Sequence, residues 1–99
     1  MAIKQESSPV TTQYRYLEPR PHRWRQQWWI KGRNMTVGQL IYNMRASDQV
    51  DDVERAAWNF DLPVAQIEEA LAYYRENRSL IEAEADEEKR RLIERGVEL

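Results

Sequence analysis

The fold depends most on one stretch of the sequence, Trp24-Arg-Gln-Gln-Trp-Trp-Ile-Lys-Gly-Arg-Asn-Met-Thr-Val-Gly-Gln-Leu40. Residues 24–31 alternate between two sets, one led by Trp24 and Trp28 and the other by Arg25 and Trp29. A period of two is typical of a β-strand and places the two sets on opposite faces. This half of the stretch therefore predicts a strand with an aromatic face and a basic face.

The second half of the stretch turns the chain into a helix. Gly32 can adopt a positive φ angle that other residues resist, so the strand is expected to turn sharply there. Thr36 and Gln39 have the spacing of a capping box, in which each side chain bonds the backbone amide of the other residue. Apolar residues at helical spacing follow, namely Val37, Leu40, Ile41 and Met44. We therefore expect a helix from residue 37 onward.

Two further helices are expected downstream, joined by a short break. The first should begin near Asp51, which has a capping spacing to Glu54, and should end before the break at residues 60–63. Pro63 suits the first turn of the next helix, because the amide it lacks would be unpaired there anyway. That helix should reach about Asn77, and the length and spacing of the pair are typical of a helix-turn-helix.

A fourth helix is predicted by a second capping-box pair, Ser79 and Glu82, and should stop at Gly96. The expected fold class is mainly α: a three-helix helix-turn-helix-like core plus a C-terminal helix, with a short N-terminal β-strand or hairpin arm. Within one compact domain overall, residues 1–13 are expected to be a disordered tail, 14–33 an extended or β arm, and 34–99 a helical domain.

The amino-acid composition limits the classes of function that are expected for this chain. The 99 residues, 41% of them hydrophobic, allow one small core, and the chain has no cysteine and one histidine, so no disulfide or ordinary zinc site is expected. It has three glycines, no Gly-rich phosphate loop and no cluster of serine, histidine and acid, so we expect no enzyme, no cofactor and no metal. It also has no apolar run of the ~20 residues that cross a bilayer and no signal-peptide stretch, which predicts a cytoplasmic protein without a membrane partner.

Charge divides the chain. Residues 1–45 carry eight Lys and Arg against two acids, and residues 46–99 carry seven against fifteen. A basic half can meet DNA and an acidic half a basic protein, or the two can attract each other within a dimer. The arm is the better candidate for DNA, because the third helix is expected to expose Gln66, Glu68 and Glu69. The predicted nucleic-acid-binding residues are Arg15, Arg20, Arg23, Arg25, Lys31 and Arg33.

Four tryptophans exceed what so small a core can hide, and exposed tryptophans, including Trp58, usually mark an interface. No second long strand is evident to pair with residues 24–30, so antiparallel pairing between two copies is predicted. The expected homodimer interface consists of Trp24, Trp28, Trp29 and Ile30. A base-stacking platform is a second interpretation of the same rings.

The fourth helix is the expected contact to a protein partner. Its apolar stripe is thin and is interrupted at Glu88, so its own domain should hold it weakly. The predicted partner-binding residues are Ile81, Ala85, Leu92 and Leu99, and the carboxylates around them would suit a basic protein. Alternatively, this helix packs across a dimer mate and its charged residues only support helicity.

Four segments form a pattern: Tyr16-Leu-Glu-Pro-Arg-Pro21, Trp29-Ile-Lys-Gly-Arg-Asn-Met-Thr-Val-Gly-Gln-Leu40, Phe60-Asp-Leu-Pro63 and Ile67-Glu-Glu-Ala-Leu-Ala-Tyr-Tyr74. Together they resemble the small bacterial proteins of domain of unknown function family 433, which are grouped with VapB-type antitoxins, over residues 14 to about 97. The Lys31-Gly32-Arg33 turn followed by Thr36-Val37 is the most specific part. The resemblance implies a helix-turn-helix-like domain after a short strand, in proteins encoded beside PIN-type ribonuclease toxins or standing alone.

The resulting hypothesis is an antitoxin-like binding module of a type II toxin-antitoxin system. It would neutralise a PIN-type nuclease toxin and regulate its own operon by binding DNA. The alternative is a stand-alone structural or adaptor homodimer without a nucleic-acid role.

Overall fold

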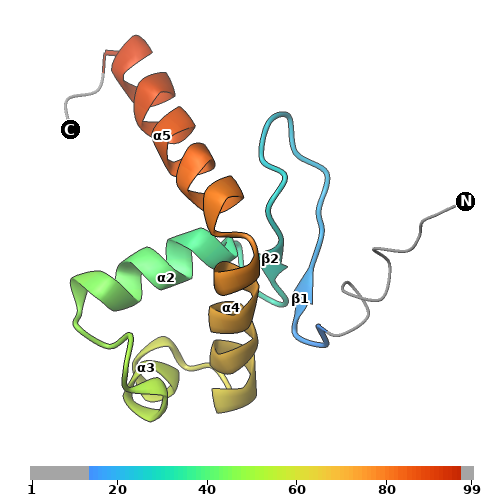
Figure 1. The fold of residues 1–99 in the computed structure, drawn as a ribbon, viewed down its shortest axis with the longest axis vertical. Helices are drawn as coiled ribbons and strands as arrows, with labels where there is room; N and C mark the ends of the chain where they lie inside the picture. Colours follow the sequence, from blue (N-terminus) through green and yellow to red (C-terminus); the bar gives the residue numbers. More distant parts are fainter. Residues whose placement is uncertain (1–13, 97–99) are drawn as a thin grey trace, which may run out of the picture.

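The computed structural model describes residues 14–96, and Figure 1 shows a mainly helical chain that begins with a two-stranded antiparallel hairpin. The predicted fold class is confirmed. The elements are β1 Leu17–Glu18, β2 Trp29–Ile30, α2 Val37–Ala46, α3 Val53–Phe60, α4 Val64–Glu76 and α5 Arg78–Glu94. The predicted tail, residues 1–13, lies outside the described residues. Within them, no helix has the length and apolar character needed to cross a membrane.

The turn and the helix start that organise the chain form as predicted. Gly32 has φ = 81°, and the Thr36 side chain accepts from the Gln39 amide while the Gln39 side chain accepts from the Thr36 amide. The next turn leaves no room for a side chain at Gly38, where a Cβ atom would lie 2.8 Å from Ile81 Cγ2. The backbone of α2 therefore lies in close contact with the Ile81 side chain of α5 at the first turn of α2.

The long strand predicted from Trp24 is wrong. Only Trp29–Ile30 is a strand, and it pairs inside the chain, with Leu17 opposite Ile30 and Glu18 opposite Trp29. The Lys31 amide also donates to the Tyr16 carbonyl at 3.0 Å. The partner of this strand is thus Leu17–Glu18 of the same chain, and not a second copy as predicted.

The hairpin contributes to the core, although residues 14–33 were predicted to form an extended or β arm. Leu17 and Ile30 are completely buried with the apolar faces of α2 and α4. The alternation of residues 24–31 fails for the same reason: Gln27, Trp29 and Ile30 are buried, so burial does not follow a period of two. Burying large apolar side chains next to the helices outweighs the local strand pattern.

Helices α3 and α4 have the predicted length and spacing, with small shifts. Asp52, not Asp51, caps α3 by accepting from the Arg55 amide, and Pro63 is the N-cap residue of α4. Between the two helices Asp61 adopts the left-handed conformation, with φ = 56°. This pair packs as a corner at one end of the molecule (Figure 1).

Part of the face of α4 that was expected to meet solvent or DNA is covered by residues 14–16, whereas Glu68 on this helix is exposed as predicted. Gln66 is buried and its side-chain amide donates to the carbonyls of Tyr16 and Lys31 at 2.9 and 3.2 Å. The Glu69 carboxylate accepts from the backbone amides of Arg15 and Tyr16. These contacts occupy positions that a recognition helix would use on a major groove.

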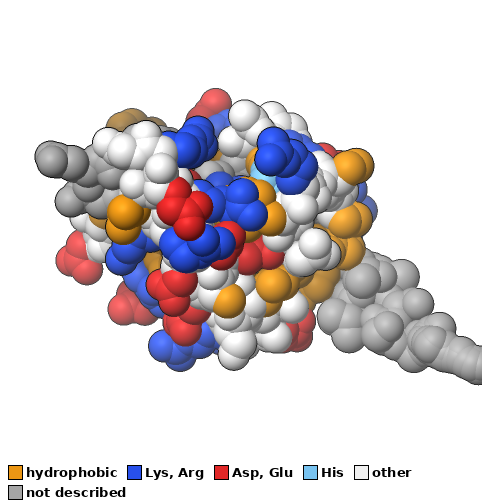
Figure 2. All heavy atoms as spheres, turned by 90° about the horizontal axis from the view of Figure 1, so that it is seen from above, with side chains coloured by type: hydrophobic (Ala, Val, Ile, Leu, Met, Phe, Trp, Pro, Cys, Tyr) orange, Lys and Arg blue, Asp and Glu red, His pale blue; other side chains and the backbone are white. Residues whose placement is uncertain are grey.

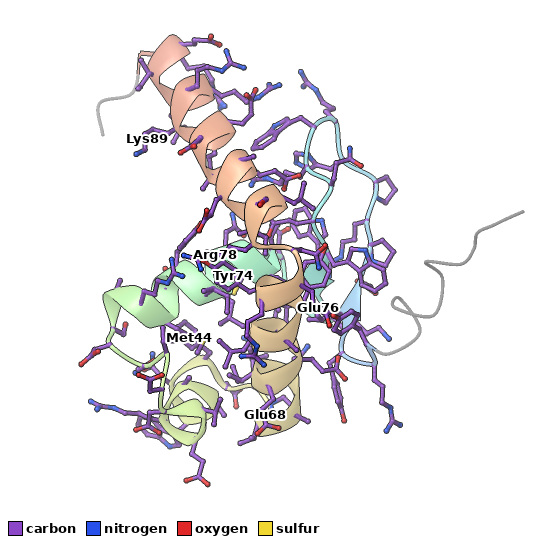
Figure 3. All side chains as sticks on the ribbon, in the orientation of Figure 1. Met44, Glu68, Tyr74, Glu76, Arg78 and Lys89 are labelled. Carbon is purple, nitrogen blue, oxygen red and sulfur yellow. The ribbon has the colours of Figure 1, made fainter. Side chains whose placement is uncertain are left out.

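Helix α5 starts at Arg78, directly after Asn77, so the predicted capping box of Ser79 and Glu82 does not form. Glu82 instead accepts from Arg78 Nε at 2.9 Å and from the Tyr74 hydroxyl at 3.3 Å, at the junction of α4 and α5 (Figure 3). The helix ends at Glu94 and Gly96 has φ = 84°, as the predicted stop requires. Its second half extends away from α2, α3 and α4, and among residues 14–96 the loop between β1 and β2 lies beside it (Figure 1).

Three tyrosines make the fold sensitive to alkali. Burial raises the pKa of Tyr42 and Tyr73 above 10.0, and burial together with the hydrogen bond to Glu76 raises that of Tyr14; Figure 3 shows Glu76 beside the hairpin. In the unfolded chain these phenols lose their protons near pH ~10, whereas the folded chain retains them. The stabilisation is therefore complete below pH ~10 and is lost as the pH rises further.

We accordingly expect the urea midpoint to fall when the pH is raised from about 9 to about 11. Tyr14→Phe should reduce the fall, because it removes one of the responsible groups, and absorbance at 295 nm should show one fewer tyrosine titrating late. A midpoint that does not change over this range would contradict the assignment.

Candidate binding site between the hairpin loop and helix α5

The loop between β1 and β2 is shaped by His22. Its Nδ1 atom accepts from the backbone amides of Trp24 and Arg25 at 3.3 and 3.1 Å, which closes a tight turn after Pro21. The imidazole ring also packs against the rings of Trp24 and Trp29, with centroids 5.6 and 5.9 Å away. The single histidine of the chain thus organises the tip of the loop.

Trp24 joins this tip to α5. Its ring stacks with two guanidinium groups, with the Cζ of Arg25 4.3 Å and that of Arg91 4.9 Å from the centroid. Arg25 also forms an ion pair with Glu88 of α5 at 3.3 Å. Stacking of cations on tryptophan is attractive because the ring faces carry negative potential, so these contacts hold the loop against the helix.

Glu84 anchors the base of the loop. It is 6% exposed, and its carboxylate accepts from the backbone amides of Gln26 and Gln27 and, at 2.9 Å, from the Gln27 side chain. The same Gln27 side chain accepts from the Gly38 amide at 2.7 Å. A buried carboxylate is tolerable only with such donors, so the loop, α2 and α5 are locked by one hydrogen-bonded network.

Beyond Glu84, the loop and the distal part of α5 line an open groove of about 600 Å³. We call it the arm groove; it is lined by His22, Arg23, Trp24, Arg25, Glu88, Arg91, Leu92, Glu94 and Arg95. Four arginines face two glutamates there, a formal charge of +2. Figure 2 looks onto this end of the molecule and shows Lys and Arg side chains gathered with acidic ones beside them.

The two acids of the arm groove are already paired. Glu88 pairs with Arg25, and Glu94 with Arg90 at 2.6 Å. Arg23 and Arg95 have no carboxylate partner among residues 14–96. The groove therefore combines two unbalanced cations with an apolar side chain, Leu92, and this combination is suited to a partner surface that is acidic around an apolar group.

Most of the predicted DNA-binding side chains are used within the chain. Arg20 donates to the carbonyl of Ile30 and pairs with Glu18, and Lys31 Nζ donates to the carbonyl of Arg15. Arg33 donates to the carbonyls of Phe60 and Asp61 at the end of α3. Arg25, paired with Glu88, is 12% exposed. Only Arg15 and Arg23 of the six are exposed without such a side-chain bond among the described residues.

The predicted dimer interface is corrected in the same way. Ile30 is completely buried and Trp29 is 9% exposed, so neither can meet a second copy without unfolding the hairpin. Trp28 packs against Tyr14 and Tyr73, and its backbone amide donates to the Tyr73 hydroxyl at 3.0 Å. Trp24 alone of the predicted set lies at the edge of a surface groove.

The predicted partner stripe on α5 divides into a buried and an accessible part. Ile81 is completely buried against α2, which corrects its assignment as a partner contact, whereas Ala85 and Leu92 are half-buried. Leu99 lies outside the described residues. Three large apolar side chains are more exposed than the described residues of that stripe: Trp58 on α3 at 84%, Ile93 on α5 at 60% and Val64 on α4 at 38%.

His22 shapes the loop and Glu84 holds it to α5, but neither residue was predicted to belong to the site. The Glu84 side chain follows Ile81 and precedes Glu88 on one helix face, a spacing that in retrospect indicates a carboxylate facing the same neighbour as the stripe. Nothing local marks His22. Within residues 14–96 there is also no group of three or more histidine, aspartate or glutamate side chains arranged to hold a metal ion.

A comparison with protein-family models, curated proteins and solved structures finds no match to this chain.

Proposed function

We propose that this chain is a binding module of the antitoxin type, which holds a protein partner at the distal part of α5. One observation carries the proposal: α5 extends past the helical body, where half-buried Leu92 lines the arm groove and Ile93 is 60% exposed. Apolar side chains on a projecting helix, surrounded by charged groups, are typical of an element that docks onto another protein.

The partner class follows from the family resemblance of the sequence. The hypothesis that the partner is a PIN-type nuclease is compatible with a helix that offers both an apolar edge and charges of both signs. Regulation by DNA binding receives less support. Gln66 and Glu69 of α4 bond the backbone of the N-terminal segment, and most of the basic side chains predicted to bind DNA bond other groups of the same chain.

The test is binding to the nuclease encoded beside the gene for this chain. The double variant Leu92→Glu and Ile93→Glu should stay folded and should weaken binding about 30-fold or more, the loss expected of about 2 kcal/mol at a hot spot. The matched control is Val64→Glu with Ala65→Glu, which adds the same two negative charges at exposed apolar positions of α4. Isothermal titration measures the affinity and circular dichroism the fold.

The region to delete also follows from the structure. Removing residues 79–99 would take away Ile81 and Glu84, so it would unfold the domain whatever its function. Ending the chain after Glu88 keeps both residues and the ion pair to Arg25. If this shorter chain, or the double variant, binds the nuclease as tightly as the full chain, the proposal is wrong; a gene without such a neighbour contradicts the toxin part of it.

A further inference from the structure

We propose that copies of this chain associate head to tail, with the α3 surface around Trp58 of one copy seated in the arm groove of the next. The inference rests on the proposed function only in taking the arm groove as a protein-binding surface, and it does not require a toxin. It also differs from the predicted two-fold dimer, because each contact joins two different surfaces.

The first surface is defined by Trp58. Its side chain is 84% exposed, the largest apolar exposure on the described part of the chain. Glu54 lies one helical turn before it on α3, and Asp61 is the C-cap residue three positions after it, so exposed carboxylates both precede and follow the indole at this end of α3. Large exposed aromatic groups are unfavourable in water, and tryptophan is the residue most enriched at the energetic centres of interfaces.

Charge complementarity selects the occupant of the arm groove. The α3 surface carries Asp51, Asp52, Glu54 and Asp61 against Arg33 and Arg55, a formal charge of −2. The groove has a formal charge of +2, and its Arg23 and Arg95 lack a carboxylate partner among residues 14–96. Glu54 and Asp61 are placed to approach two such cations if the indole enters between them.

The groove can also receive the indole. Its volume of about 600 Å³ lies in the range of sites that hold ligands larger than one side chain, and Leu92 and the edge of Trp24 give it an apolar part. Seating Trp58 there would remove from water the apolar group that the isolated chain leaves most exposed.

The two surfaces cannot meet within one chain. Helix α3 lies at the opposite end of the molecule from the distal part of α5, along a body that measures 45 Å in its longest dimension (Figures 1 and 3). A contact between different surfaces of identical chains adds one copy after another and closes only if the rotation allows a ring. The association should therefore exceed a dimer at high concentration.

Sedimentation of the full chain over a range of concentrations tests this. The unmodified protein should form species larger than a dimer, with a mass that rises with concentration unless a ring closes. Trp58→Ala should weaken the association about 30-fold, as expected for a hot-spot residue. The double variant Arg23→Glu and Arg95→Glu changes the arm groove instead of the α3 surface and should weaken the association to a similar extent. Both changes affect exposed side chains, and circular dichroism checks that the variants fold.

Mixing the two variants gives the decisive result. Trp58→Ala retains an intact groove and the arginine variant an intact α3 surface, so together they should form a 1:1 complex that grows no further. The matched control is Arg15→Glu with Arg75→Glu, the same charge change at exposed positions outside the groove, which should associate like the unmodified chain.

A protein that stays monomeric at all concentrations, or variants that do not combine when mixed, would overturn the inference. A two-fold dimer that Trp58→Ala leaves intact would overturn it as well. All of these experiments use this chain alone, so their failure leaves the nuclease measurement untouched; loss of self-association with normal nuclease binding, or the reverse, separates the two proposals.

Discussion

Replacing Glu84 with alanine is expected to lower the free energy of unfolding by about 3 kcal/mol or more, since hydrogen bonds to a charged group contribute about 1.5–3 kcal/mol each. The carboxylate is 6% exposed and accepts from two backbone amides and one side-chain amide of the loop. Alanine would leave these donors buried without a partner and would open a void between the loop and α5.

Glu84→Gln is the informative comparison. It retains the volume and one carbonyl oxygen, so Gln27 can keep an acceptor and the loss should be smaller, about 1–2 kcal/mol. Urea unfolding followed by circular dichroism gives both values, and the intrinsic fluorescence of Trp24 and its neighbours reports the loop. If the alanine variant is as stable as the unmodified chain, the network does not hold the loop to α5.

Ile81→Ala is the second change with a large expected effect, a loss of about 2–5 kcal/mol in the free energy of unfolding. Its side chain is completely buried, and its Cγ2 atom is only 2.8 Å from where a Cβ atom at position 38 would lie. Because Gly38 has no side chain to move into the space, the cavity should remain largely unfilled. The same substitution at half-buried Leu92 should cost about 1 kcal/mol or less.

This pair of variants separates a core role from a partner role on one helix. Chemical unfolding should place Ile81→Ala well below the unmodified chain and Leu92→Ala close to it, while association and nuclease binding should respond to Leu92. Equal losses of stability at the two positions would contradict the division of α5 into a packed half and an accessible half.

Local signals predicted the helix boundaries well where a side chain bonds its own helix end. The capping box of Thr36 and Gln39 formed as expected because both partners lie within one turn. The pair Ser79 and Glu82 has the same spacing but formed no box, because α5 begins directly at Arg78 and Glu82 bonds Arg78 and Tyr74 instead. Spacing alone cannot tell which of two available partners a carboxylate will take.

The binding site was predicted in pieces but not as a whole. Arg23, Arg25 and Trp24 were assigned to a nucleic-acid surface and a dimer interface, and Leu92 to a partner contact. The structure brings all four to one groove, since Glu84 and Glu88 tie the loop to a helix some sixty residues away in sequence. Pattern arguments work within one element and carry no information about which elements become neighbours.

By itself the sequence determined what depends on neighbouring residues: four helices after a short β segment, the turn at Gly32, and the start of α2 at the Thr36 cap. Tertiary structure alone decided which apolar side chains are hidden. Ile30 and Ile81 entered the core while Trp58 stayed outside, because burial depends on whether another element arrives to cover a side chain and not on how apolar that side chain is.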